Sequence, residues 1–597
     1  MQKIFGIYGL ENFSDAEAVE TISKTLSPER NVSRGLEFWS DESNLALGAA
    51  GDSILESFSG DCLTLSGEIE NSLEIATQLK SEGFPIENNV LLSALGSWGL
   101  EHTLKKLKGK FCFAWWCSKS EKLTIARDRF GINPIYWCAE NEKGCILFAS
   151  EIKTLLATGF IPRKVNAEAV IDYLRYSTVH APLTVVDGIQ LLEPGCAIEI
   201  QDETVNVLRW WETSKEISPS GIQPIDETLL NAVNSKLAGE SQAIYLSGAP
   251  NSITLTAAMS QVSQNPVNTF SLEFEGSESP TEDAPSRIST HFSTNHTKVF
   301  IPQKAIPAKL QEAIDQMDHP SLHGLRSYFV ATSAKAAGYT SVVSEIGGNE
   351  LFGEHPLFDD AVQLMKHRWL TAWPRGLRKS AGKLLQTISP GERSNKLAEI
   401  LASNYFDLEH TYPLARQITF DRQIKKLAPN LPLTRNKVFY TATDLLRVGK
   451  AAFSLPFLSK ASVLEMNTHM VDILLRDNHT FHSGNGTDYT TPFLDHSLVS
   501  QMLGCRDSRK PSLEEVTQKI ASKNVQSKTD SASKFPWELK LEGSYLEFHE
   551  EGMTALSDLK MFHARGVQEF DNNPLHGVEK RLNLSILGHY LKKNNLT

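Results

Sequence analysis

Two short segments carry polar residues at points where an apolar strand gives way to a helix. The first, YLSGAPNSITL, covers 245–255, and the second, SEIGGNELFGE, covers 344–354. Backbone N–H groups and serine hydroxyls in such turns suit a phosphate, because a helix N-terminus adds partial positive charge. Ala249, Pro250 and Asn251 stand where a phosphate site favours glycine and a carboxylate. These turns predict a nucleotide site, or what remains of one.

The segments around the two turns predict a parallel sheet covered by helices. QAIYLS and VNTFSLEF are typical of buried strands, and SITLTAAMSQVSQ and SYFVATSAKAAGY of helices. Strands that alternate with helices favour a parallel sheet with helices on its faces. Residues 1 to about 200 contain short β-type runs such as FCFAWWC, and the chain after about residue 355 is mostly helical in period.

Composition limits the classes of function. The 597 residues suffice for two to four domains, and 41% hydrophobic residues are typical of globular proteins. The net charge of −12 argues against a general nucleic-acid or anionic-membrane binder. The seven cysteines form no CxxC pair, which argues against a zinc site or a disulfide framework. With no secretory signal pattern at the start, we expect a cytoplasmic protein that binds neither nucleic acid nor membrane.

ARDRFGINPIYW, FASEIK and TPFLDHSLV together resemble the asparagine synthetase family. The resemblance implies a mixed α/β and α+β fold. It comprises an N-terminal class II glutamine-amidotransferase-like domain of the Ntn-type αββα class and a C-terminal adenine-nucleotide α-hydrolase-like domain with a helical C-terminal part. The implied boundaries are 1–210 for a degenerate glutaminase-like domain, 225–540 for an ATP-pyrophosphatase domain and 541–597 for a helical extension.

The resemblance also implies that glutamine hydrolysis is lost. Phe5 stands where the family has its nucleophilic cysteine, and a phenyl ring offers no nucleophile. Ser66 replaces an oxyanion-hole asparagine, whereas Gly67 and Glu68 match the family pattern. Residues 86–90 lack the carboxylate that would bind the substrate amine. The expected glutaminase nucleophile is therefore none.

In the second domain, the resemblance assigns metal binding to Asn251 and Asn349, both of which replace aspartates. Mg²⁺ prefers anionic oxygens, so ATP and Mg²⁺ are expected to bind weakly if at all. The implied catalytic residues are Glu350 and Lys528, with a solvated lysine as the alternative for Lys528. The implied ATP-binding positions are Leu246, Ser247, Gly248, Asn251, Ser252, Leu272, Ser344, Glu345 and Gly347. Glu345 stands where the family has glycine and adds a negative side chain near the phosphate turn.

Two hypotheses of function follow from the resemblance. The first is a pseudoenzyme that acts as a partner subunit for an active paralogue or another biosynthetic enzyme. The alternative is an active ATP-dependent amide ligase or cyclase, of asparagine, lactam or lasso-peptide type, that uses ammonia or another amine. A third hypothesis is a purely structural protein that keeps the old fold. A homodimer is left open.

Two further features have interpretations without a functional role. The residues His319, His323 and His355 lack metal-ligand spacing, and we expect no metal there. The basic segment KHRWLTAWPRGLRK is interpreted as a solvated helical face with two anchoring tryptophans, with partner docking as the alternative.

Overall fold

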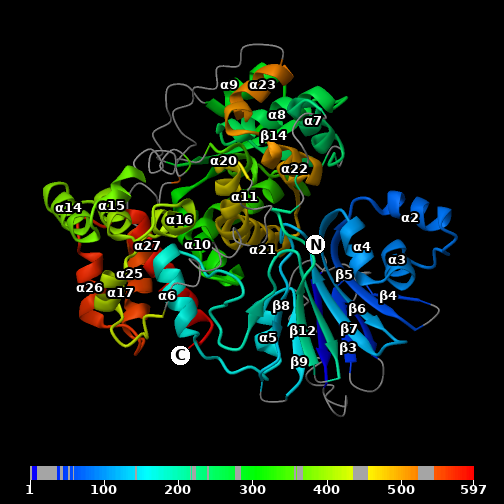
Figure 1. Ribbon diagram of the computed structural model, residues 1–597, viewed down its shortest axis with the longest axis horizontal. Helices are drawn as coiled ribbons and strands as arrows, with labels where there is room; N and C mark the ends of the chain where they lie inside the picture. Colours follow the sequence, from blue (N-terminus) through cyan, green and yellow to red (C-terminus); the bar gives the residue numbers. More distant parts are fainter. Residues whose placement is uncertain are drawn as a thin grey trace. The chain divides into compact units, whose positions relative to one another are not determined.

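A computed structural model represents the chain. It describes residues 3–9, 36–40, 45–50, 54–57, 60–141, 144–202, 204–215, 217, 223–237, 241–275, 284–354, 358, 368–434, 455–521, 535 and 544–596. The chain forms two compact units, shown in Figure 1. The first comprises 1–166, 180–213 and 596–597, and the second comprises 167–179 and 214–595. The domain boundaries implied by the sequence stay predictions.

The first unit contains two six-stranded antiparallel sheets. One sheet has the order β10-β8-β9-β1-β3-β2, and the other has the order β12-β11-β7-β6-β5-β4. In the first sheet the strands are β1 (Lys3–Tyr8), β2 (Leu36–Ser40), β3 (Leu45–Ala50), β8 (Tyr136–Cys138), β9 (Ile146–Ala149) and β10 (Gln190–Leu191). In the second they are β4 (Ile54–Glu56), β5 (Cys62–Ile69), β6 (Gly109–Cys117), β7 (Lys122–Arg127), β11 (Cys196–Gln201) and β12 (Thr204–Arg209).

Helices cover the two sheets of the first unit on their outer faces. One apolar cluster joins both sheets, from Ile4 and Leu47 to Cys112 and Ile198. A second cluster packs α2 (Ser72–Ser81), α3 (Val90–Trp98) and α4 (Leu100–Lys106) on the second sheet, and α5 (Ile152–Ala157) contacts β9. This helix–sheet–sheet–helix layering confirms the predicted Ntn-type αββα class.

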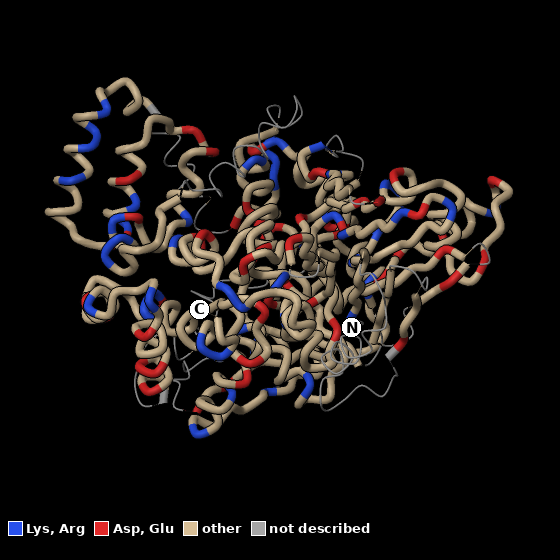
Figure 2. The backbone as a smooth tube through the Cα atoms, turned by 90° about the horizontal axis from the view of Figure 1, so that it is seen from below, with Lys and Arg blue, Asp and Glu red and all other residues tan. Residues whose placement is uncertain are grey.

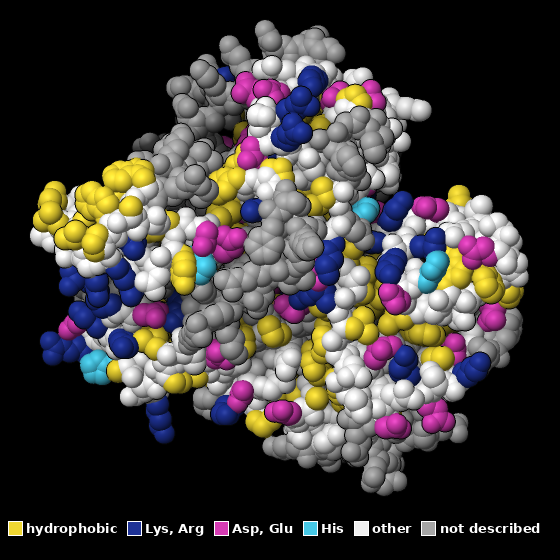
Figure 3. Space-filling view, viewed as in Figure 1, with side chains coloured by type: hydrophobic (Ala, Val, Ile, Leu, Met, Phe, Trp, Pro, Cys, Tyr) yellow, Lys and Arg dark blue, Asp and Glu magenta, His cyan; other side chains and the backbone are white. Residues whose placement is uncertain are grey.

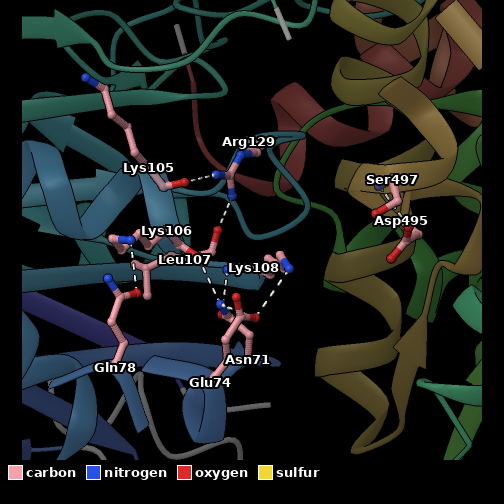
Figure 4. A network of polar contacts seen from close by, with 10 residues as sticks. All are labelled: Asn71, Glu74, Gln78, Lys105, Lys106, Leu107, Lys108, Arg129, Asp495 and Ser497. Carbon is pink, nitrogen blue, oxygen red and sulfur yellow. Dashed lines mark hydrogen bonds and ion pairs between the residues drawn. The ribbon is translucent and has the colours of Figure 1, made fainter. Parts of the chain in front are cut away.

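The ARDRFG motif of this unit has a structural role. The buried Arg127 guanidinium donates to the carbonyls of Asn133 at 2.9 Å and Gly131 at 2.6 Å, and Asp128 accepts from three backbone N–H groups of the same turn. Arg129 donates to carbonyls of 105 and 107, next to a network in which Asn71 bridges the backbone of 106 and 108 (Figure 4). The motif therefore fixes backbone turns.

The second unit is built on a five-stranded, wholly parallel sheet of order β15-β14-β13-β16-β17. The strands are β13 (Gln242–Tyr245), β14 (Asn268–Phe274), β15 (Asn295–Ile301), β16 (Ser341–Val343) and β17 (Asp488–Thr490). The strand order reverses its direction at β13, whose neighbours are β14 and β16. Ligands of open α/β sheets bind beyond the carboxyl ends of strands at such a switch point, and both polar turns begin there.

Helices accompany this sheet and form the remainder of the unit. Those nearest the sheet are α7 (Ile225–Asn234), α8 (Pro250–Val262), α9 (Ala284–Phe292), α10 (Ile306–Gln316), α11 (Leu322–Ala336), α12 (Gly348–Phe352), α22 (His496–Gly504) and α23 (Leu513–Ala521). The helical part comprises α14 (Arg375–Ile388), α15 (Glu392–Ala402), α16 (Leu408–Arg416), α17 (Asp421–Leu427), α20 (Phe457–Glu465), the π-helix η3 (Met466–Leu475), α21 (Arg476–Asn485), α25 (Ser544–Ser557), α26 (Ala564–Asp571) and α27 (Val578–Lys593).

One helix of the N-terminal third belongs to the second unit. In helix α6 (Ala167–Tyr176), the Tyr173 hydroxyl donates to Asn583 Oδ1 at 2.6 Å, and Arg175 Nε forms an ion pair with Asp421 Oδ1 at 2.9 Å. Within the described part of the chain, no helix is long and apolar enough to cross a membrane.

Candidate functional site

The first polar turn leaves β13 as the sequence predicts. Leu246 is fully buried and donates its N–H to the Phe270 carbonyl of β14 at 2.8 Å. Gly248 has φ of 84°, a left-handed conformation that suits glycine. Helix α8 then begins at Pro250, where a proline costs no intrahelical hydrogen bond. The turn thus keeps the strand-to-helix geometry of a phosphate-binding loop.

Polar groups inside this turn are satisfied by one another. Ser252 Oγ donates to the Ala249 carbonyl at 2.9 Å, and the Ser252 N–H donates to Asn251 Oδ1 at 3.1 Å. The Ser247 hydroxyl accepts from the Ala249 N–H at 3.3 Å. Asn251 is 95% buried, so its amide belongs to the packed interior of the turn.

Glu345 connects the second turn to the first. Ser247 Oγ donates to Glu345 Oε2 at 3.2 Å, so a carboxylate of the chain itself contacts the serine of the phosphate-type turn. Burial raises the pKa of Glu345 to about 7; the Ser247 hydrogen bond opposes this rise, Glu350 adds to it, and Arg326 opposes it. Arg326 on α11 therefore lies within electrostatic range of this carboxylate.

The second turn closes on Asn251. Gly347 has φ of 97°, and Gly348 starts the short helix α12. A Cβ placed on Gly348 would lie 3.0 Å from the Asn251 Cβ and 2.9 Å from a ring carbon of Phe493. The structure therefore brings the segment that begins α12, with Asn349, beside Asn251, as the resemblance implies for the two metal positions.

Glu350 is buried at the start of α12 and accepts from the Gly347 N–H at 3.1 Å. Burial raises its pKa to about 7, and among the charges around it Glu465 raises it and Arg416 lowers it. The position implied as catalytic thus stabilises the backbone of the turn in this chain, and its carboxyl is largely neutral below pH 7.

The Arg416–Glu465 ion pair next to Glu350 is absent from the sequence prediction. Arg416 Nε donates to Glu465 Oε1 at 2.9 Å, and Nη2 donates to the other carboxylate oxygen. Glu465 is fully buried at the end of α20. One turn further along the chain, the hydroxyls of Thr468 and Tyr412 share a hydrogen bond of 2.7 Å. The signal available in the sequence is one acidic residue within the apolar run SVLEMNTHM.

The other predicted positions have mixed outcomes. Ser344 follows β16, and its N–H donates to the Thr490 carbonyl of β17 at 2.8 Å. Leu272 lies in β14, the neighbour of β13, where it pairs with Val299 of β15. Lys528 and His355 lie outside the described residues.

A second polar cluster lies where α11 begins. Ser321 Oγ donates to Asp477 Oδ2 at 2.5 Å, and His323 Nδ1 is 3.6 Å from the same oxygen. Arg476 donates to the Val179 carbonyl at 2.9 Å and to Thr178 at 3.0 Å. Among the described residues, no group of three or more His, Cys, Asp and Glu side chains has a metal-binding arrangement.

In the first unit, Phe5, which the resemblance aligns with the nucleophilic cysteine, is held by packing. Phe5 is 98% buried in β1, and a Cβ on the facing Gly48 would lie 2.0 Å from its ring. The ring also contacts Phe38 edge to face, with centroids 5.8 Å apart. Ser66 offers its carbonyl to Asn133 Nδ2 at 2.9 Å, within a buried strand.

These residues do not fit a magnesium–ATP group well. An anionic phosphate competes with the Glu345 carboxylate for the Ser247 hydroxyl, and like charges in a partly buried turn repel strongly. The two amides Asn251 and Asn349 offer neutral oxygens to a divalent ion.

Comparisons with known proteins agree with the two-part architecture. A family model described as glutamine amidotransferase domain matches residues 47–211, and one described as asparagine synthase matches residues 224–521. "Asparagine synthetase [glutamine-hydrolyzing] 3" of Bacillus subtilis is 27% identical over 335 residues, which are 51% of this chain and 53% of that protein. "Asparagine synthetase [glutamine-hydrolyzing] 1" of the same organism is 25% identical over 456 residues, 72% and 68% of the two chains.

Another relative is named for a different activity. "Amidase chry2" of Gibberella zeae is 23% identical over 424 residues, which are 65% of this chain and 58% of that protein. The chain thus matches between about half and two thirds of the length of these relatives.

Proposed function

Because the chain belongs to the asparagine synthetase family, we propose that it is a pseudoenzyme of this ATP-dependent, amide-forming family. In this proposal it hydrolyses no glutamine, forms acyl-adenylate poorly or not at all, and acts by binding. Its partner is an active paralogue or another enzyme of a biosynthetic pathway.

The contact between Ser247 and Glu345 carries the proposal. A phosphate bound by the turn after β13 requires the Ser247 hydroxyl and the neighbouring N–H groups as donors. Glu345 Oε2 already accepts from that hydroxyl at 3.2 Å, and its negative charge opposes a second anion. At an effective dielectric constant near 20, two unit charges about 4 Å apart repel by roughly 4 kcal/mol.

The neutral metal positions add to this effect. Asn251 is buried, and its Oδ1 accepts from the Ser252 N–H at 3.1 Å. To coordinate a metal ion, this amide oxygen would have to give up its internal hydrogen bond. It would also offer the ion no full negative charge. In the first unit, the Phe5 ring on Gly48 leaves no thiol to attack glutamine.

Calorimetric titration with Mg-ATP and a pyrophosphate-release assay test the proposal. We expect the wild-type chain to bind Mg-ATP only weakly and to release no pyrophosphate with aspartate plus ammonia. A triple variant, Glu345→Gly with Asn251→Asp and Asn349→Asp, is expected to bind Mg-ATP. Robust turnover by the wild-type chain with ammonia would instead establish the alternative, an active amide ligase that bypasses glutamine.

A further inference from the structure

Helix α14 exposes apolar side chains along one face. Leu377, Leu384 and Ile388 are 58%, 60% and 73% exposed, and their spacing of seven and four residues places them on one stripe of the helix. Figure 3 shows hydrophobic side chains gathered over α14 and α15. We call this stripe, with the two tryptophans below, the hairpin surface.

Two tryptophans continue the stripe beyond the start of the helix. Trp369 in the short helix η2 (Arg368–Ala372) is 56% exposed and Trp373 is 47% exposed, and their rings meet edge to face with centroids 6.0 Å apart. The interpretation of this segment as a solvated face agrees with its exposed residues, but the two tryptophans do not anchor it, because about half of each side chain is exposed.

The hairpin formed by α14 and α15 packs together without this apolar stripe. Gly382 lies against Ala398 of α15, and a Cβ there would be 3.1 Å from the Ala398 Cβ. The buried Arg378 donates to the carbonyls of 401 at 3.1 Å and 403 at 2.8 Å, and its guanidinium lies 5.1 Å from the Phe406 ring centre. Close glycine packing and one buried arginine hold α14 to α15, and the leucines point away from that contact.

The charge of this segment is opposite to that of the whole chain. Residues 368–403 contain seven Lys and Arg against two Asp and Glu, a net charge of +5 in a chain of −12. Figure 2 shows basic residues spaced along this helical pair, which lies at the left of the view. Helix α14 itself carries no acidic residue, and Lys383 is exposed. Since salt screens charges beyond about 8–10 Å, the distant acidic residues do not cancel this local field.

We propose that the hairpin surface attaches the protein to an anionic lipid surface. An exposed helix with leucine, isoleucine and tryptophan on one stripe and lysine and arginine beside it suits the boundary between acyl chains and headgroups. Positive residues attract anionic headgroups, and tryptophan rings occupy the headgroup level. Lysine is depleted at protein interfaces, so the lysines of this segment favour a lipid surface over a protein partner. The local charge thus qualifies the expectation, drawn from net charge, that the chain binds no membrane.

Vesicle sedimentation with the full chain tests this proposal. We expect binding to phosphatidylcholine vesicles that contain roughly 30 mol% phosphatidylserine, and binding at least about tenfold weaker to pure phosphatidylcholine. Raising the salt from about 0.05 M to about 0.5 M is expected to release the protein. Lys383→Gln is expected to weaken the partition coefficient about fivefold.

The apolar part has a matched control. The double variant Leu384→Asp, Ile388→Asp is expected to abolish vesicle binding, whereas Leu73→Asp leaves it unchanged, because Leu73 is 82% exposed on α2 of the first unit. Leu73, Leu384 and Ile388 are all exposed, so these substitutions are expected to leave the protein folded. The thermal unfolding midpoints of the variants check this.

Equal sedimentation of the wild type and the double variant would overturn the proposal. So would self-association of the wild type, seen by light scattering and lost in the double variant, without vesicle binding; that result would assign the surface to a second copy of the chain. Neither outcome depends on ATP binding, so this proposal and the proposed function fail separately.

Discussion

Replacing Glu345 by glycine, the residue that the family resemblance places there, tests how far one carboxylate governs the anion turn. The substitution removes the carboxylate acceptor 3.2 Å from Ser247 Oγ, and that hydroxyl can then turn from Ser252 Oγ, also at 3.2 Å, to a ligand. Glu345→Gln is the matched control, because it keeps the size of the side chain and removes the charge.

The magnitude follows from the contact. A phosphate oxygen that accepts from Ser247 would lie roughly 4 Å from the carboxylate, where repulsion is about 4 kcal/mol at an effective dielectric constant near 20. Solvent screening of the partly buried Glu345 reduces this to ~1–2 kcal/mol. We therefore expect Glu345→Gly to bind ATP about five- to thirtyfold more tightly than the wild type at pH 8.

The effect depends on pH in a defined direction. The pKa of Glu345 is raised to about 7, so the group is mostly neutral at pH 6 and mostly ionised at pH 8. Wild-type affinity for ATP is expected to fall as pH rises through 7, and Glu345→Gln is expected to lack this fall. Subtracting the Gln profile removes the titration of the ATP phosphates.

Isothermal titration calorimetry between pH 6 and 8 measures both effects. Equal dissociation constants for the wild type and Glu345→Gly across this range would show that the carboxylate is not opposed to a phosphate. Tighter binding by the glycine variant alone, with the glutamine variant unchanged, would show that bulk and not charge blocks the turn.

Three further changes probe the same framework. Phe5→Cys is expected to restore no glutaminase activity in an ammonia-release assay and to lower the free energy of unfolding by ~3 kcal/mol, since it leaves a cavity over Gly48. Glu350→Gln is expected to raise that free energy by ~1–3 kcal/mol at pH 8.5 and to leave it unchanged near pH 4, measured by urea denaturation: the pKa rises from 4.5 to about 7, so the cost of ionising the folded state builds up between these values. Arg416→Met is expected to cost ~3–5 kcal/mol by the same measurement, because it leaves the buried Glu465 carboxylate unpaired, and a cost below that of an exposed pair such as Arg565–Glu569 would contradict the pairing.

Local patterns predicted much of the fold. The run predicted as a helix after Ser247-Gly248 is α8, and the runs QAIYLS and VNTFSLEF contain β13 and β14. These elements follow from apolar spacing and from proline and glycine at their ends, which act within a few residues. The parallel sheet of the second unit and the layered first unit confirm the fold class.

Long-range contacts were beyond such patterns. The sheet of order β15-β14-β13-β16-β17 contains strands from Gln242 to Thr490, and no local pattern in the sequence predicts this order. The Ser247–Glu345 contact is visible only once β13 and β16 are adjacent. The sequence identified Glu345 as an unusual charge near the turn but gave it no partner, and it did not identify Arg416 and Glu465 as the charges around Glu350.

The two sites implied by the family resemblance share one physical feature that bears on the proposed function. Active sites hold polar groups ready for a ligand at a cost to stability, and filling such a site internally relieves that cost. In the first unit the Phe5 ring packs on Gly48, and in the second the Ser247 hydroxyl finds Glu345 and the Asn251 amide finds the Ser252 N–H. Both places thus contain side chains that satisfy one another, which favours a stable framework over turnover and agrees with a role in binding.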